Sequence, residues 1–181
     1  MELLERLEAA RKALGREART DCVVVSIGEQ KLAHFRCRQP VAEYAVSTSR
    51  AEPSCVENSL GTPTGLHEVA EKIGGDQPNG MVFKARKPLG VTCWEMPEAE
   101  RTDNLITSRI LRLTGLENGR NRGGHRDTYA RYVYIHGTNQ EAKLGTPNSH
   151  GCVLLGNVEM IRLYATLPEG AYVWIEDDRG W

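Results

Sequence analysis

The residues best suited to covalent chemistry lie in one stretch, 134–157, which contains two histidines and one cysteine, each beside a glycine. His136 begins this pattern, and His150 lies two positions before Cys152. A cysteine attacks as the thiolate, and a thiol with an ordinary pKa of about 8.5 is only a few per cent ionised at pH 7. An imidazole within hydrogen-bond reach would therefore activate Cys152. The stretch can supply a nucleophile, a base and backbone donors for an oxyanion.

Gly151, directly before Cys152, matters for the charge that develops after attack. Because glycine has no side chain, a ligand can approach the backbone closely at this position. We expect the amide groups of Gly151 and Cys152 to point toward a developing oxyanion.

Two other interpretations of Cys152 remain open. Cysteine is among the most buried residue types, so a lone cysteine that enters an apolar strand is usually part of the core. His136, His150 and Gly151 favour the catalytic interpretation. A zinc site is the second alternative, since histidine and cysteine are good ligands. The stretch lacks a fourth ligand and a C-x-x-C pair, so we expect neither a metal nor another cofactor.

The elements around these residues would bring them together. Residues 131–135 are aromatic and β-branched and predict a strand that ends at His136. Residues 139–148 contain glycine and proline and predict a loop. An apolar run follows Cys152 and predicts a second strand. We therefore expect Cys152 and His136 at neighbouring strand ends.

The rest of the chain predicts a mainly β fold with two flanking helices. The N-terminal helix is amphipathic and should pack on the outside of the domain, and Asn157 should be the N-cap of the second helix. His67 should face the surface of its strand. Residues 84–96 are expected to be irregular and 176–181 to be frayed. The predicted strands are 21–27, 31–37, 41–47, 66–70, 81–83, 105–116, 131–135 and 171–175, and the predicted helices are 3–14 and 158–165.

The motifs resemble the signature of the L,D-transpeptidase catalytic domain family. This resemblance rests on His136-Gly137-Thr138, on Leu-Gly-x-Pro in the loop and on Ser149-His150-Gly151-Cys152-Val153. The turn at 61–65 matches the family's Thr-Pro-x-Gly turn, and the similarity continues to residue 175. It implies a mixed β-sandwich, with residues 1–20 as an N-terminal helix and 21–181 as the catalytic domain.

The resemblance also implies a bacterial peptidoglycan enzyme. In that family a cysteine attacks the carbonyl of the third residue of a tetrapeptide stem and releases the terminal D-alanine. The thioester passes to an amine, which gives a 3–3 cross-link, or to water, as in an L,D-carboxypeptidase. The expected partners are stem peptides or soluble muropeptides. A non-catalytic peptidoglycan-binding module on the same fold is the alternative, and faster alkylation of Cys152 than of the other cysteines near neutral pH would argue against it.

When the family's functional residues are assigned to the matching positions of this sequence, the resemblance implies that Cys152 is the nucleophile and His136 the general base. The backbone carbonyl of Gly137 would orient the base. The positions that frame the oxyanion pocket would be Ser149, His150 and Gly151.

One position departs from the family pattern. The family usually has arginine two residues after the cysteine, whereas this chain has Leu154. A basic, glycine-rich loop at 117–129 precedes the strand that ends at His136. Arginine binds carboxylates bidentately, and peptidoglycan stems carry several carboxylates. We therefore predict that a loop arginine replaces the missing contact, the candidates being Arg120, Arg122 and Arg126.

Composition restricts the classes of function. The net charge of −1 and the absence of a nucleic-acid motif argue against a nucleic-acid partner. The five cysteines are odd in number and irregularly spaced, which favours a reducing compartment. The sequence contains neither a signal-like segment nor an apolar run of membrane-spanning length, about 18 residues. We expect a cytoplasmic enzyme of muropeptide recycling, or a periplasmic or wall-associated one if the given chain was trimmed.

Overall fold

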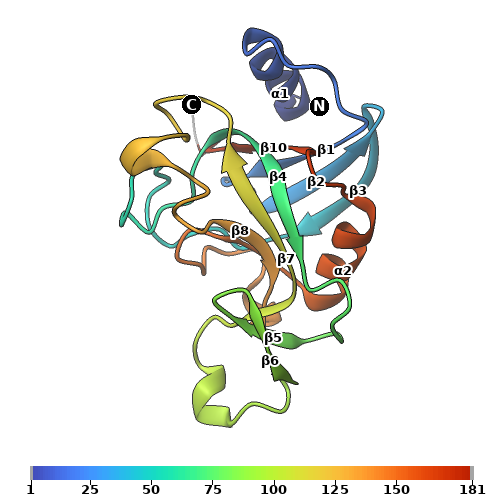
Figure 1. Cartoon of the computed structure of the whole chain (residues 1–181), viewed down its shortest axis with the longest axis vertical. Coiled ribbons are helices and arrows are strands. Elements are labelled where there is room, and N and C mark those ends of the chain that lie inside the picture. The colour runs from blue at the N-terminus through green and yellow to red at the C-terminus, as the bar shows by residue number, and fades with distance from the viewer. Residues whose placement is uncertain (1, 180–181) are drawn as a thin grey trace.

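The computed structural model describes residues 2–179, which form a mainly β fold with two α-helices (Figure 1). Ten strands make one curled, mixed sheet within these residues. In chain order the elements are α1 (Glu2–Ala13), β1 (Asp21–Ser26), β2 (Lys31–Arg36), β3 (Gln39–Ala45), β4 (Gly65–Ile73), β5 (Met81–Lys84), β6 (Lys87–Thr92), β7 (Ile106–Gly115), β8 (Tyr134–Gly137), β9 (Val153–Leu155), α2 (Asn157–Thr166) and β10 (Tyr172–Glu176).

The strand order brings the two chemically important segments side by side. The sheet runs β3-β2-β1-β10-β4-β7-β5-β6, and β8 joins it at β7 and carries β9 on its other edge. β1 pairs with β10 and β8 with β9 in parallel, and the remaining pairs are antiparallel. β8 and β9 can pair in parallel because the long loop 138–152 brings the chain back to the end of the sheet at which β8 begins.

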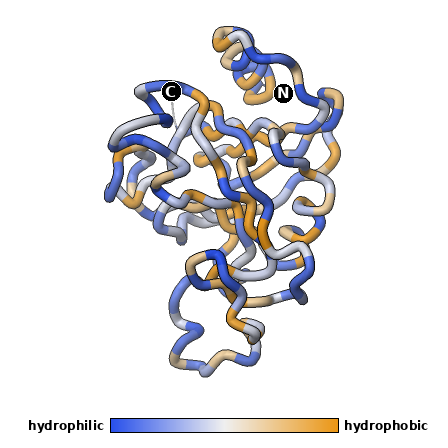
Figure 2. The backbone as a smooth tube through the Cα atoms, viewed as in Figure 1, coloured by the Kyte–Doolittle hydropathy of each residue, from blue (hydrophilic) through white to orange (hydrophobic). Residues whose placement is uncertain are grey.

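The main core lies between the β1–β10–β4 part of the sheet, the β7–β8–β9 part and α2. Alternate residues of each strand enter it, for example Val23 and Val25 of β1 and Ile135 of β8. The hydrophobic residues are concentrated in these strands, whereas the outer loops are largely hydrophilic (Figure 2). Burial of this apolar surface, at about 25 cal/mol per Å², is the main stabilising contribution to the fold.

α1 covers the other face of β1 and β10, as predicted for the N-terminal helix. Leu4 and Leu7 are 1% and 0% exposed and pack with Trp174 and Tyr172. All six residues of β1 are buried because the core lies on one face and this helix on the other.

The structure corrects three predictions about these elements. β8 begins at Tyr134 and not at residue 131, because Tyr132 has a φ of 56° in the left-handed region and cannot continue an extended strand. His67 does not face the surface: it is fully buried, since the loop that carries Asn121 and Thr128 folds over β4. Residues 84–96 are not irregular throughout, because β6 pairs with β5 there.

The C-terminal segment is better ordered than predicted. Glu176 belongs to β10, and the carboxylate of Asp178 accepts hydrogen bonds from the Ser26 hydroxyl at 2.5 Å and the Gly28 amide at 2.7 Å. Residues 180 and 181 of the predicted frayed tail lie outside the described residues.

Candidate active site

Cys152 and His136 belong to neighbouring segments of the sheet. Cys152 directly precedes β9, and His136 of β8 pairs in register with Leu154 of β9. Residues 152 and 154 share one face of β9, and Tyr134 and His136 share the same face of β8. Cys152 packs against the cluster that contains Tyr134, whose ring lies 6.5 Å from the His136 ring. Tyr134 therefore adjoins both reactive side chains.

His136 is held in a single orientation by its own strand. Its Nδ1 lies 2.7 Å from the carbonyl oxygen of Gly137, and the side chain is buried. A carbonyl only accepts hydrogen bonds, so Nδ1 carries the proton and Nε2 is left as the acceptor of the neutral ring. Burial lowers the pKa of His136 to about 4, opposed by the Gly137 hydrogen bond. The imidazole is therefore neutral at pH 7 with a free basic nitrogen.

The Cys152 thiol is also uncharged in the resting structure. Burial raises its pKa to about 11, while the amide of Tyr134 and the charge of Arg131 act in the opposite direction. The sulfur lies 3.4 Å from the Tyr134 nitrogen and 3.8 Å from the Tyr132 oxygen. Within residues 2–179 no hydrogen bond joins this sulfur to His136. The resting site thus differs from a preformed thiolate–imidazolium pair.

A tight turn leads into Cys152, which is partly buried. Ser149 is buried, and its hydroxyl donates to the Cys152 carbonyl at 2.6 Å and accepts from the Gly151 amide at 3.2 Å. Gly151 has a φ of 127°, a conformation that other residues rarely adopt. A Cβ there would lie 3.4 Å from the Gly61 carbonyl oxygen, so the two turns are in close contact. The Gly151 amide is occupied within the turn, which corrects the expectation that it points toward an oxyanion.

His150 turns away from His136 and toward solvent. Its Nε2 lies 2.8 Å from the Arg50 guanidinium, which can only donate, so Nε2 accepts. The two side chains line a cavity of ≈ 440 Å³. Its polar walls also include Thr102, Asp103, Asn104, Gln140, Lys143 and Asn148.

The zinc hypothesis requires His136, His150 and Cys152 to converge, and the structure does not bring them together. His136 is buried on β8, whereas His150 is exposed and contacts Arg50. Among residues 2–179 no group of three or more histidine, cysteine or acidic side chains is arranged to hold a metal ion.

Arg120, the first of the predicted loop arginines, is engaged by other parts of the chain. Arg120 forms an ion pair with Glu117 at 2.8 Å and its guanidinium lies 6.0 Å from the Trp174 ring, in the cluster beneath α1. Arg122 and Arg126 are exposed on the 117–129 loop. Leu154 is 1% exposed, so the position of the family's arginine is closed to solvent in this chain.

Arg131 is the charged neighbour that the sequence analysis missed. Its guanidinium donates to the carbonyls of Ser54 at 2.9 Å and Gly61 at 2.8 Å, and its charge opposes the burial that raises the pKa of the Cys152 thiol. It thereby connects the 52–61 loop to the start of β8. The aromatic and β-branched residues at 132–135 predict a strand that includes position 131. Nothing in the neighbouring sequence distinguishes this arginine from one on the surface.

Asn157 is buried beside the end of β8, where its side chain bonds to neighbouring elements. The prediction that it is an N-cap is wrong. Gly156 occupies the cap position, and Asn157 is the first residue of α2. Its side-chain oxygen accepts from the hydroxyls of Thr107 and Ser108, both at 2.6 Å. Its amide donates to the Thr138 carbonyl at 2.9 Å. These buried partners outcompete a capping role and join β7, the end of β8 and α2.

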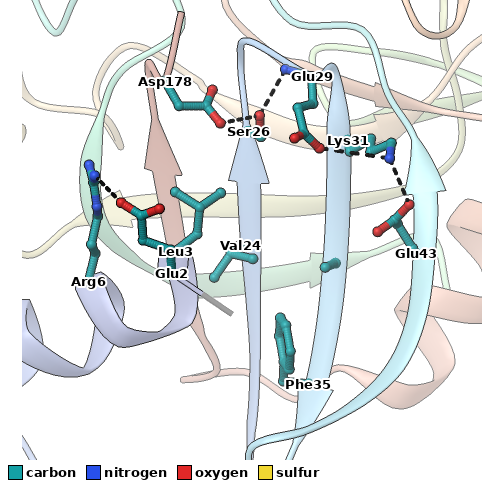
Figure 3. A pocket seen from close by; sticks show the side chains of 11 residues that line it. Glu2, Leu3, Arg6, Val24, Ser26, Glu29, Lys31, Phe35, Glu43 and Asp178 are labelled. Atoms are coloured by element: carbon teal, nitrogen blue, oxygen red, sulfur yellow. Dashed lines mark hydrogen bonds and ion pairs between the residues drawn. The ribbon is translucent and has the colours of Figure 1, made fainter. Parts of the chain in front are cut away.

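A second cavity lies away from the thiol, under α1 (Figure 3). Val24 and Phe35 form its apolar floor, and ion pairs such as Lys31 with Glu43, at 3.2 Å, form its rim. The cavity measures ≈ 310 Å³ and contains no cysteine or histidine. It adds no chemistry to the site around Cys152.

Comparison with known proteins places this geometry in a family. Residues 20–175 match the YkuD family, described as the L,D-transpeptidase catalytic domain. The Bacillus subtilis protein YqjB, whose name assigns it provisionally to the L,D-transpeptidases, is 43% identical over 51 residues, or 28% of this chain and 29% of that protein.

Solved structures show the same fold. An L,D-transpeptidase from Mycobacterium smegmatis has a TM-score of 0.54 at 15% identity, over 89% of this chain and 60% of that one. L,D-transpeptidase 3 from Mycobacterium tuberculosis has a TM-score of 0.53 at 16% identity, over 90% and 62%. This chain therefore spans less than two thirds of these proteins. None of the helices in residues 2–179 is long and apolar enough to cross a bilayer.

Proposed function

Because the chain belongs to the L,D-transpeptidase catalytic domain family, we propose that it is a cysteine enzyme that acts on peptidoglycan tetrapeptide stems. The observation that supports this most is the arrangement of Cys152, His136 and Gly137. The thiol directly precedes β9, the imidazole belongs to the neighbouring β8, and the Gly137 carbonyl leaves Nε2 of His136 free to accept a proton. This is the arrangement of a nucleophile and a base fixed by a third group.

The proposed first half-reaction forms a thioester. As the Cys152 sulfur attacks the carbonyl carbon of the third stem residue, its proton passes to Nε2 of His136. The tetrahedral intermediate collapses, the peptide bond breaks, and the leaving D-alanine amine takes the proton back from His136. The enzyme is then acylated at Cys152 and the imidazole is neutral again.

The second half-reaction releases the acyl group. Water or an amine attacks the thioester and gives its proton to His136, and the expelled Cys152 sulfur recovers that proton. The product is a tripeptide stem with water and a new amide with an amine. The two reactions share the thioester and the path of the proton, so they differ only in the acceptor: water for an L,D-carboxypeptidase and an amine for an L,D-transpeptidase.

In this mechanism proton transfer accompanies attack. Both groups are neutral at rest, since burial lowers the pKa of His136 to about 4 and raises that of Cys152 to about 11. The sulfur must also turn from the Tyr132 carbonyl toward His136, and a change of χ1 rotamer is the smallest such movement. Catalytic hydrogen bonds commonly tighten only when substrate binds.

We propose water as the main acceptor and soluble muropeptides as the substrate. Trimming of D-alanine from free tetrapeptides would serve recycling of the wall in the cytoplasm. Cross-linking in the wall is the second possibility, because water and amine compete for one thioester.

The test is incubation of the enzyme with soluble disaccharide-tetrapeptide, followed by mass spectrometry. Cys152→Ala is the control, because it removes the sulfur and leaves a small side chain. We expect tripeptide from the wild type and none from the control. Cross-linked dimers or exchange of the D-amino acid would identify a transpeptidase. An unchanged substrate in both samples would contradict the enzymatic proposal and favour a non-catalytic peptidoglycan-binding module.

A further inference from the structure

The tip of the β5–β6 hairpin places an arginine beside the strand that carries His136. Ala85 and Arg86 form a two-residue turn with φ values of 48° and 66°, the geometry that suits a tight hairpin. The Arg86 guanidinium donates to the Tyr134 hydroxyl at 3.1 Å and lies 4.9 Å from the centre of the Tyr132 ring. These two tyrosines also provide backbone atoms that contact the Cys152 sulfur.

The local charge is positive and not balanced. Arg112 pairs in register with Tyr134, and its guanidinium lies 5.0 Å from the Tyr132 ring. It is nearly buried and forms an ion pair with Glu71 at 3.3 Å. Arg86, in contrast, contacts two neutral groups and pairs with no carboxylate within residues 2–179. The Glu71 carboxylate thus pairs with Arg112 and not with Arg86.

The backbone beside the thiol is also strained. Tyr132 is a bulky residue with a φ of 56°, a left-handed conformation that is unfavourable for such a side chain. This conformation places its carbonyl against the Cys152 sulfur and leaves half of the side chain exposed next to Arg86. The ring and the guanidinium therefore form one accessible surface next to the nucleophile.

We propose that Arg86 binds the C-terminal carboxylate of the acyl donor, the carboxylate of the departing D-alanine. The proposal rests on the function proposed above and specifies how its substrate is recognised. That carboxylate lies one residue beyond the scissile carbonyl. Arg86 is likewise separated from the thiol by the length of the Tyr134 side chain, because it contacts the hydroxyl while the sulfur contacts the amide of the same residue. A guanidinium suits the role because it can bind a carboxylate bidentately.

The test compares a tetrapeptide that has a free C-terminal carboxylate with its C-terminal amide. For the wild type we expect kcat/KM to be about 10- to 100-fold lower on the amide, the range that a charge-assisted hydrogen bond represents. Arg86→Gln should lose a similar factor on the free acid and little on the amide, and Arg86→Lys should lose less. Lys87→Gln removes an exposed charge from the same hairpin and should retain the wild-type ratio.

Two results would overturn the assignment. In the first, Arg86→Gln keeps the wild-type ratio between acid and amide. In the second, it loses activity equally on both substrates, which indicates a structural role of the hairpin. If the wild type cleaves neither substrate, the proposed reaction fails, and binding of the two peptides to Cys152→Ala by calorimetry decides the assignment separately. A preference for the acid that Arg86→Gln abolishes supports it, and no preference contradicts it.

Discussion

At the scale of single residues, burial keeps both members of the Cys152–His136 pair uncharged. The main cause is the same for both: removal from water disfavours the thiolate and the imidazolium alike. The nearby Arg131 charge reduces the penalty for the thiolate without removing it. The free enzyme is therefore expected to be a poor nucleophile until a substrate reorganises the site.

This state predicts how alkylation of Cys152 depends on pH. With a pKa near 11, the thiolate fraction rises about tenfold per pH unit from pH 7 to 10, so the iodoacetamide rate should rise in parallel. The rate is measured by mass spectrometry of the peptide that contains Cys152, with exposed Cys37 as an internal reference. A plateau below pH 8 would instead show a preformed ion pair with His136, the behaviour expected from sequence alone.

At the scale of elements, Asn157 is the main polar connection beneath the site. It is 2% exposed and satisfies hydroxyls from β7 and a carbonyl from the loop after β8. Because α2 begins at this residue, the helix, β7 and the end of β8 share one hydrogen-bond network. The position of His136 thus depends on a side chain outside the signature motif.

Asn157→Ala should destabilise the protein by about 3 kcal/mol or more. The substitution leaves the Thr107 hydroxyl and the Thr138 carbonyl without partners, whereas the Ser108 hydroxyl keeps its contacts with Asn79 and Gly80. An unsatisfied buried polar group costs about 1–3 kcal/mol. Urea denaturation measures the effect. Val158→Ala is the matched control, since Val158 follows in α2 and is 46% exposed. Equal stability of the two variants would show that water replaces the lost contacts.

The sequence predicted most elements, and it supplied Cys152 as the candidate nucleophile, but it did not predict the surroundings of the site. Cys152 and His136 stand in a contiguous motif, so local pattern suffices to find them. Arg131 lies beside Cys152 only because β8 pairs with β9. Arg86 lies beside Tyr134 only because the tip of the β5–β6 hairpin, far away along the chain, folds next to β8. His67 was misplaced because alternation in a strand does not show whether a later loop will cover its outer face.

At the scale of the whole molecule, the buried histidines His67 and His136 contribute to the response to acid. Burial lowers the pKa of both His67 and His136 to about 4, against an ordinary value of 6.5. The unfolded chain therefore binds two protons before the folded protein does. Their contribution to stability is fully present above pH 6.5 and is lost as the pH falls through 4.

The free energy of unfolding should thus fall between pH 6.5 and 4.5, with a slope that approaches about 2.7 kcal/mol per pH unit for two groups. Urea denaturation at several pH values gives this slope. His67→Gln should reduce it by about half. His125→Gln, which changes an exposed histidine, should leave it unchanged. A slope that does not respond to His67→Gln would show that this side chain is accessible to protons in the folded state.

The hairpin that carries Arg86 is attached to the rest of the sheet through β7, at Val82 with Thr107 and Phe83 with Ile106. The proposed nucleophile and base belong to β8 and to the turn before β9, so the segment that would recognise the substrate and the segment that would cleave it are encoded separately. Residues 84–87 could then be exchanged without changing the catalytic motif. The arrangement makes substrate choice a modular property, open to divergence in nature and to grafting in the laboratory.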